Sequence, residues 1–155
     1  MELELINHWD KAIIDEDDYE RASRYNWRYE WSTGYISGRI NNRYVLLHRF
    51  ILNLTDPKIY TDHINRNKLD NRKCNLRKCT PAENSRNRKP TAGHIYKGVK
   101  VSKKTGTITA GIVYERKYIY LGRFKTLKEA ALAYDLAAIK YHKEFARLNF
   151  SGTNN

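Results

Sequence analysis

The stretch DHINRNKLDNRKCN, residues 62–75, sets a carboxylate, an imidazole and several side-chain amides in one short polar segment. Asp62 and His63 are adjacent, and Asn75 follows the histidine by twelve residues. This segment is therefore the first candidate for a site, and its neighbours indicate how it is folded.

A short helix is predicted directly downstream. Thr80-Pro81-Ala82-Glu83 has the capping-box pattern, with proline at the favoured first helical position. Upstream, Leu69–Asn71 form a polar loop between two short extended pieces. An order of strand, loop, strand and helix would bring Asp62 and His63 close to Asn84 of the helix.

Several short motifs in this region resemble those of the HNH homing endonucleases, which share a ββα-metal fold. Their typical elements are L-H-R, D-H-I-N/D, N-N/R, N-L and C-T-x-x-E-N. The matching residues are Leu47–Arg49, Asp62–Asn65, Asp70–Arg72, Asn75–Leu76 and Cys79–Asn84. The segment AIIDEDDYERASRYNWRYE, residues 12–30, also resembles the leader that precedes this motif, so the resemblance covers about residues 10–88.

The resemblance implies a role for several of these residues. His63 would be the general base that deprotonates water for in-line attack on a phosphodiester. Asp62 and Asn84 would bind a divalent cation through oxygen, which implies Mg²⁺ with Mn²⁺ as a substitute. Asn75 would hold the loop and orient His63 by hydrogen bonding. His48 is either structural or in contact with a phosphate.

The cysteines do not support a structural zinc site. Cys74 and Cys79 are the two cysteines, and no second pair is present to complete four ligands. Both are expected to be reduced and packed.

The C-terminal part predicts three strands and one helix. Strand-like runs cover about 95–102, 107–114 and 117–124, and a helix begins at Thr126 with a second capping box. Small and aromatic residues recur at helical spacing on one face of that helix. They are Ala130, Tyr134, Ala137, Ala138 and Tyr141.

This part resembles the ethylene-response-factor (Apetala-type) DNA-binding domain, a three-stranded antiparallel sheet backed by one helix. The matching elements are Tyr96–Val99, Ala110–Ile112, Leu121–Phe124, the helix, and Leu148–Phe150. In that family the sheet face away from the helix enters the major groove. Alternation predicts two sets of side chains. Those facing the helix are Val99, Val101, Ile108, Ala110, Ile112, Tyr114, Ile119 and Leu121. Those facing away are Lys97, Lys100, Ser102, Thr107, Thr109, Tyr118 and Tyr120.

The sequence departs from that family at the positions that read bases. Lys97, Lys100 and Ser102 stand where the family has arginines, and Gly111 and Val113 replace its Glu and Arg in the second strand. The usual sheet Trp positions hold Lys104 and Tyr120. Lysine does not make the rigid bidentate contact to guanine that arginine makes. The resemblance therefore implies DNA binding without the family's sequence preference.

The charge favours a polyanionic partner. The net charge of the 155 residues is +12, divided as −5 over residues 1–30, +9 over 31–89 and +8 over 90–155. Candidate DNA contacts near the polar segment are Arg49, Arg66, Lys68, Arg72, Lys73, Arg77 and Lys78. Candidate contacts in the C-terminal part are Lys97, Lys100, Ser102, Lys103, Lys104, Thr109, Arg116, Lys117, Tyr118 and Tyr120.

Together these observations predict an α+β protein with an N-terminal ββα-metal (HNH) domain and a three-stranded antiparallel sheet backed by one helix. The predicted domains are 1–88 including the leader, a linker at 89–94, 95–150, and a tail at 151–155. The expected activity is that of a site-directed, divalent-metal-dependent DNA endonuclease of the homing type that leaves 5′-phosphate and 3′-hydroxyl ends.

The expected partner is double-stranded DNA, with no membrane and no small-molecule substrate; the sequence does not set the oligomeric state. Without a visible signal peptide, the expected location is the cytoplasm of a bacterial or phage-infected host cell, which fits a phage or other mobile-element origin. Two alternatives stay open. One is a sequence-specific DNA-binding regulator with an inactive nuclease domain, and the other is an RNA-binding protein.

Overall fold

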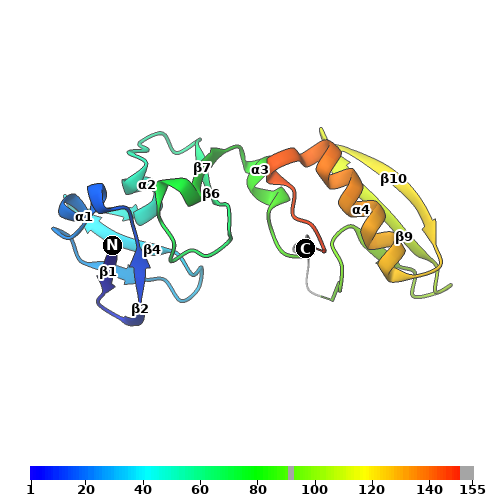
Figure 1. Cartoon of the computed structure of the whole chain (residues 1–155), viewed down its shortest axis with the longest axis horizontal. Coiled ribbons are helices and arrows are strands. Elements are labelled where there is room, and N and C mark those ends of the chain that lie inside the picture. The colour runs from blue at the N-terminus through cyan, green and yellow to red at the C-terminus, as the bar shows by residue number, and fades with distance from the viewer. Residues whose placement is uncertain (91–92, 151–155) are drawn as a thin grey trace. The chain divides into compact units, whose positions relative to one another are not determined.

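The computed structural model of the chain describes residues 1–90 and 93–150, and it is α+β, as the sequence predicts (Figure 1). The predicted tail over 151–155 and residues 91–92 of the predicted linker lie outside the described residues. The chain divides into two compact units, Met1–Asn84 and Ser85–Asn155. Among the helices described, none is both long enough and apolar enough to cross a membrane.

The first half of the N-terminal unit folds into a five-stranded sheet with one helix. Its elements are β1 (Glu2–Leu5), β2 (His8–Ile13), α1 (Glu16–Ala22), β3 (Trp27–Tyr29), β4 (Ile36–Ile40) and β5 (Arg43–Leu46). The strand order is β2-β1-β3-β4-β5, and only the β1–β3 pair is parallel. The segment expected to be a leader thus supplies a helix and a strand of the sheet. Because β3 has only three residues, its strand character depends on pairing with β1 and β4, which no local pattern reveals.

The polar pair Asn41–Asn42 between two strand-like runs predicts a hairpin with a tight turn, and β4 and β5 form that hairpin. Asn41 and Asn42 form its turn, and their φ angles are 50° and 61°. A two-residue turn with both φ angles positive matches the twist of antiparallel strands, and asparagine tolerates that conformation better than most residues.

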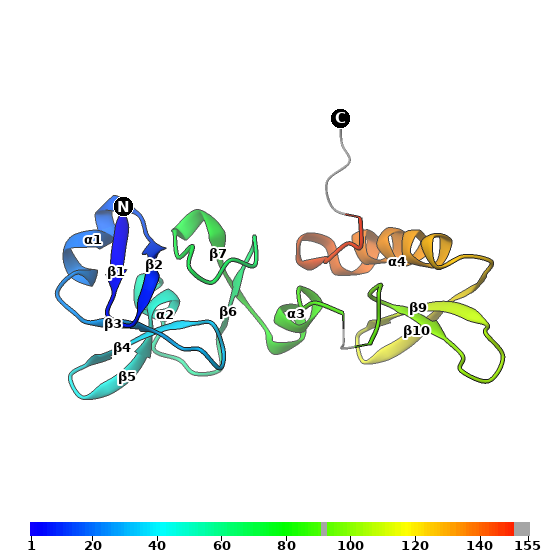
Figure 2. The same cartoon turned by 90° about the horizontal axis from the view of Figure 1, so that it is seen from below.

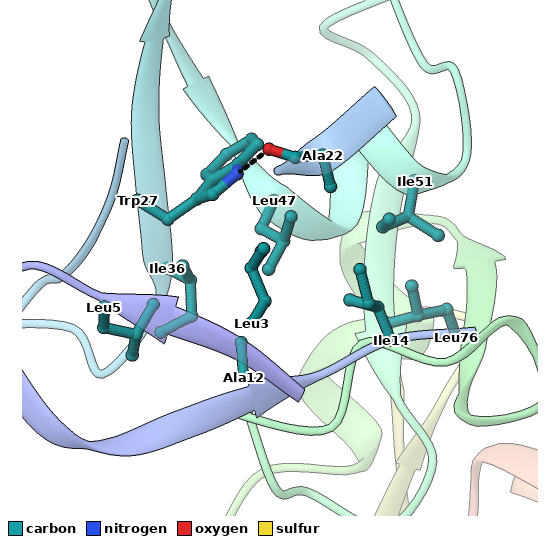
Figure 3. Packing of buried hydrophobic residues seen from close by; sticks show 10 residues of the cluster. All are labelled: Leu3, Leu5, Ala12, Ile14, Ala22, Trp27, Ile36, Leu47, Ile51 and Leu76. Atoms are coloured by element: carbon teal, nitrogen blue, oxygen red, sulfur yellow. Dashed lines mark hydrogen bonds between the residues drawn. The ribbon is translucent and has the colours of Figure 1, made fainter. Parts of the chain in front are cut away.

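A hydrophobic core joins this sheet to the segment that carries the polar cluster (Figure 3). Trp27 is fully buried, and its indole Nε1 donates to the carbonyl of Ala22 at 2.9 Å. Leu47 and Ile51 enter the core from helix α2 (Leu47–Ile51), and Leu76 enters it from strand β7 (Leu76–Cys79). The sheet therefore positions α2 and β7, and with them the candidate site.

The polar segment lies between two antiparallel strands that are followed by a helix. Strand β6 (Tyr60–His63) pairs with β7, the 3₁₀ turn η1 (Lys73–Asn75) precedes β7, and α3 (Pro81–Arg86) follows it. The capping box at the start of α3 is present. Thr80 Oγ1 accepts the backbone N–H of Glu83 at 3.3 Å, and the Glu83 carboxylate accepts that of Thr80 at 2.8 Å.

The C-terminal unit is a three-stranded antiparallel sheet packed against one long helix (Figure 2). Its elements are β8 (Val99–Val101), β9 (Ile108–Tyr114), β10 (Lys117–Phe124), α4 (Leu127–His142) and the 3₁₀ turn η2 (Lys143–Phe145). The sheet order is β10-β9-β8, and the predicted capping box at Thr126 is present. The alanines on the predicted face of the helix are buried, together with Tyr134.

Two sequence predictions about packing are wrong. Val101, expected to face the helix, is 50% exposed, because it is the last residue of the edge strand β8 and belongs to neither cluster under α4. Cys74, expected to be packed, is exposed, whereas Cys79 is buried. Cys74 lies in the turn η1, where only Asn75 is buried.

Candidate functional site

An ion pair joins the neighbouring strands β6 and β7. Asp62 and Arg77 are direct partners in the antiparallel register. The guanidinium Nε and Nη2 of Arg77 both donate to Oδ2 of Asp62, at 2.9 and 2.6 Å. The Asp62 side chain is only 7% exposed and that of Arg77 is 16% exposed. A largely buried carboxylate is therefore neutralised by a charge on the neighbouring strand.

His63 ends strand β6 inside a group of rings and amides. Its side chain is buried, and its Nε2 lies 3.3 Å from Oδ1 of Asn71. The ring of His48, on α2, meets that of His63 edge to face, with centroids 5.4 Å apart. The ring of Tyr35 lies beside both imidazoles, with its centroid 5.1 Å from that of His48 and 6.1 Å from that of His63.

Burial lowers the pKa of both imidazoles and so favours their neutral forms. It lowers the pKa of His63 below its ordinary value, and the Asn71 contact and the Asp62 carboxylate partly oppose that shift. For His48, burial acts together with the nearby His63 and Arg49 and lowers the pKa to about 3. A neutral His63 at neutral pH is able to accept a proton.

Asn75 braces the loop that joins the two strands. Its Oδ1 accepts the backbone N–H of Asn65 at 2.8 Å, and its Nδ2 donates to the carbonyl of Asp70 at 2.7 Å. Its own carbonyl accepts the N–H of Ile64 at 2.9 Å. Asn75 thus ties the residues that follow His63 to the far side of the loop, and its effect on His63 acts through this backbone.

Asp62 and Asn84 supply oxygen atoms of the kind that a hard divalent cation prefers. Asp62 lies on β6, and Asn84 lies on α3, where its backbone N–H donates to the carbonyl of Thr80 at 3.0 Å. Within residues 1–90 and 93–150, no group of three or more His, Cys, Asp or Glu side chains is arranged to hold a metal ion. A carboxylate and an amide oxygen are donors that suit a hard divalent cation keeping several water ligands.

Several cations expected at phosphates have partners inside the N-terminal unit. Arg49 donates to the carbonyls of Asp56 and Ile59, each at 2.6 Å, and so organises the loop before β6. The ammonium of Lys73 lies 2.9 Å from Oδ2 of Asp18, which is buried at the start of α1. These side chains stabilise the fold, and their contact with DNA stays a prediction.

Two further cations of this set also contact neighbours. The Lys68 ammonium lies 4.0 Å from the centroid of the Tyr35 ring and donates to the carbonyl of Thr33. Arg72 forms a bidentate pair with the buried Asp70, with both contacts at 2.8 Å. The exposed members of the set include Arg66 and Lys78.

The sheet of the C-terminal unit carries exposed tyrosines on the face predicted to meet DNA. Tyr118 and Tyr120 are 53% and 55% exposed. Tyr118 lies over Gly111, where an added Cβ would stand 2.0 Å from the tyrosine hydroxyl. The Lys100 ammonium lies 5.4 Å from the centroid of the Tyr118 ring. The missing side chain at Gly111 thus lets an aromatic ring lie across the sheet, beside a cation.

Of the other candidate DNA contacts in this unit, some side chains are exposed and others contact backbone carbonyls of the protein. The exposed ones are Ser102, Lys103, Lys104, Arg116 and Lys117. Thr109 is half-buried, and its hydroxyl lies 3.5 Å from the carbonyl of Lys100. The Lys97 ammonium donates to the carbonyls of Arg86 and Arg88, so this lysine is partly occupied by backbone groups.

Two site features escaped the sequence analysis. Asn71 contacts the His63 ring, although the orienting contact was expected from Asn75. The pairing of Asp62 with Arg77 also went unnoticed, because it depends on the register of β6 and β7 and those residues are fifteen apart. The register would follow from sequence only if the length of the intervening loop and its fold were already known.

Comparisons with known proteins place the chain. No family model matches it, and no solved structure matches it. It is 36% identical over 148 residues to an uncharacterised HNH endonuclease of Acanthamoeba polyphaga mimivirus, a match covering 89% of this chain and 74% of that protein.

Two Arabidopsis thaliana proteins match a smaller part of the chain. One ethylene-responsive transcription factor is 44% identical over 61 residues, and an AP2-like ethylene-responsive transcription factor is 46% identical over 57 residues. These matches cover 38% and 36% of this chain, but only 14% and 16% of those proteins.

The chain is α+β, with a buried aspartate–histidine pair in its N-terminal unit and a sheet bearing exposed tyrosines in its C-terminal unit. The chain belongs to the HNH endonuclease family, and about a third of it is similar to AP2-type transcription factors. Both resemblances inferred from the sequence are thereby confirmed.

Proposed function

We propose that this protein is a divalent-metal-dependent DNA endonuclease of the homing type, which cuts double-stranded DNA and leaves 5′-phosphate and 3′-hydroxyl ends. The observation that carries the proposal is the pair Asp62–His63 at the end of β6, with both side chains buried and the pKa of the His63 imidazole lowered by that burial. The similarity to an HNH endonuclease over most of the chain supports it.

In this proposal His63 takes the proton of the attacking water. Its low pKa keeps the imidazole unprotonated at neutral pH, and the contact of Nε2 with Asn71 holds the ring. Asn75 fixes the backbone that follows His63 through its two side-chain hydrogen bonds. The chain thus holds the general base in one orientation before substrate arrives.

Asp62 and Asn84 are the proposed ligands for Mg²⁺, with Mn²⁺ as a substitute. A bound divalent cation supplies stabilisation of the negative charge that develops on the leaving 3′ oxygen. The carboxylate contributes charge and the amide contributes a neutral oxygen, a combination that leaves positions for water and phosphate oxygens.

The C-terminal sheet is proposed to bind duplex DNA in the major groove. Its outward face carries Tyr118, Tyr120 and Lys100, and the turns at both ends of β9 add exposed lysines and an arginine. The wide major groove of duplex DNA admits a β-sheet, whereas the deep, narrow major groove of duplex RNA does not. Duplex DNA is therefore the favoured partner.

The test is Mg²⁺-dependent cleavage of a large mixed duplex library, with every new 5′ end sequenced. Wild type is compared with His63→Ala, and His94→Ala serves as a control because His94 is an exposed histidine of the other unit. We expect recurrent ends in wild type and His94→Ala that vanish in His63→Ala. Ends that persist in His63→Ala would show that His63 is not the base. Tight duplex retention without any ends would instead favour a DNA-binding regulator.

A further inference from the structure

We propose that Arg77 is an exchangeable counter-ion of Asp62. It neutralises the carboxylate while no cation is bound, and it leaves Asp62 for a DNA phosphate when the cation binds. This inference rests on the proposed function, in which Asp62 is a metal ligand. It assigns to Arg77 a link between metal binding and DNA binding.

The geometry makes Arg77 the immediate competitor for the carboxylate. Asp62 and Arg77 face each other across β6 and β7, and two N–H groups of the guanidinium converge on the single oxygen Oδ2. Both side chains are largely buried, at 7% and 16% exposed, so water screens the pair poorly. A cation that uses this carboxylate enters the space next to a fixed positive charge.

Electrostatics then favours exchange over coexistence. A guanidinium and a divalent cation on one carboxylate repel each other, and the repulsion is stronger away from bulk water. Conversely, a buried carboxylate without any counter-charge is costly, which explains why the DNA-free protein needs Arg77 in this place. The released guanidinium is suited to a phosphate, because its planar fork matches phosphate oxygens.

A second aspartate–arginine pair, in the loop that joins β6 to β7, provides a contrast. Asp70 accepts from Arg72 through both of its oxygens, and Asn65 also donates to Oδ2 at 2.8 Å. The loop residues around Asp70 are held by Asn75. That pair is therefore a structural brace, whereas the proposed function gives Asp62 a second partner. Arg24 has the same charge, lies in the same unit and pairs with the exposed Glu20 at 2.6 Å, outside the candidate site, so Arg24 serves as the matched control.

The exchange of Arg77 predicts that binding of the divalent cation and binding of DNA are coupled. Binding of the cation without DNA takes Arg77 away from the Asp62 carboxylate, whereas bound DNA also offers the guanidinium a phosphate in its place. DNA should therefore strengthen cation binding, and by reciprocity the cation should strengthen DNA binding through the same contact. A neutral side chain at position 77 removes the competitor and the coupling together.

The experiment measures the Kd of Mn²⁺ for the full-length protein by isothermal titration calorimetry, first without DNA. We expect Arg77→Met to bind Mn²⁺ about tenfold more tightly than wild type, since a charge in contact with the site is removed. Arg24→Met should stay within about twofold of wild type, because it removes an exposed ion pair away from the candidate site. Arg77→Gln also removes the charge but keeps a hydrogen-bond donor for Asp62, so it replaces Arg77→Met if Arg77→Met does not fold. Arg77→Gln should likewise bind Mn²⁺ about tenfold more tightly than wild type. Arg77→Lys keeps the charge and should behave like wild type.

The second arm repeats the titration with a bound duplex, in a His63→Ala background that prevents cleavage. DNA should lower the Kd of Mn²⁺ when Arg77 is present and should have a much smaller effect with Gln at that position. If Arg77→Met and Arg77→Gln bind Mn²⁺ as wild type does, or more weakly, Arg77 only organises Asp62 and the exchange is wrong. If wild type neither binds Mn²⁺ with DNA nor cleaves, the proposed function itself fails, which is a different result.

Discussion

Gly98→Ala tests how tightly the C-terminal sheet packs on its helix. Gly98 immediately precedes β8, its φ is +75°, and its carbonyl accepts the N–H of Gly111 at 2.9 Å. A Cβ at this position would lie 1.9 Å from Cδ2 of Tyr134, a side chain of α4 that is only 3% exposed. Because Tyr134 is enclosed by the core, it cannot move aside without disturbing its neighbours.

The expected cost has two parts. A non-glycine residue in the left-handed region loses about 1 kcal/mol. Forcing an extra methyl group into a packed core costs about 1–3 kcal/mol more. The free energy of unfolding of this unit should therefore fall by about 2–4 kcal/mol, which lowers the Tm of a small unit by about 10–30 °C.

Gly111→Ala is the matched control for this substitution. Its Cβ would also meet a tyrosine, with 2.0 Å to the hydroxyl of Tyr118. That ring is 53% exposed and able to swing into solvent, so we expect a loss of about 1 kcal/mol or less. The two variants thus make the same chemical change against a buried ring and an exposed ring.

Two spectroscopic signals follow the two units. Trp9, Trp27 and Trp31 are the three tryptophans and all lie in the N-terminal unit, whereas far-UV circular dichroism reports both units. We expect Gly98→Ala to lower the Tm seen by circular dichroism and to leave the tryptophan fluorescence transition in place. A Tm change no larger than that of Gly111→Ala would refute the packing argument.

Three further predictions follow from other contacts. Asn75→Ala leaves two backbone groups of the loop without their partners and should lower the free energy of unfolding by about 2–4 kcal/mol, measured by urea unfolding followed by tryptophan fluorescence. His142 is buried, its Nδ1 has no hydrogen-bond partner among the residues that the structure describes, and burial lowers its pKa. The unfolded chain therefore binds the proton more readily, and the stability of the C-terminal unit should be constant above the ordinary histidine pKa of about 6.5 and fall as the pH drops below it. His142→Gln should flatten that fall in thermal unfolding series at different pH values. Lys100→Ala should reduce the slope of log K against log salt for duplex binding by about 1, measured by fluorescence anisotropy, if Lys100 contacts a phosphate.

Local patterns in the sequence predicted the elements that carry their own signals. The hairpin turn at Asn41–Asn42, the capping boxes at Thr80 and Thr126, and the strands of the C-terminal sheet all depend on neighbouring residues. The sheet formed by β1, β2 and β3 has no such signal. Its strands are short, and β1 pairs with β3 in parallel across the intervening β2 and α1.

In the candidate site, too, some features follow from local sequence and others depend on the tertiary structure. The sequence by itself determined which side chains are available: an aspartate next to a histidine, amides in a loop, an asparagine on a helix, and lysines and tyrosines on one sheet face. It also determined the family, because many short motifs agree at once. These features depend only on residue type and local spacing, which can be read directly from the sequence.

Only the tertiary structure decided which of these groups contact each other. It brought Arg77 opposite Asp62, Asn71 to the ring of His63, and His48 edge to face with that ring. It also showed that Arg49, Lys73 and other cations hold loops of the N-terminal unit. The physical reason is that strand register and burial depend on the packing of the whole core, so a buried charge and its partner are chosen by distant parts of the chain.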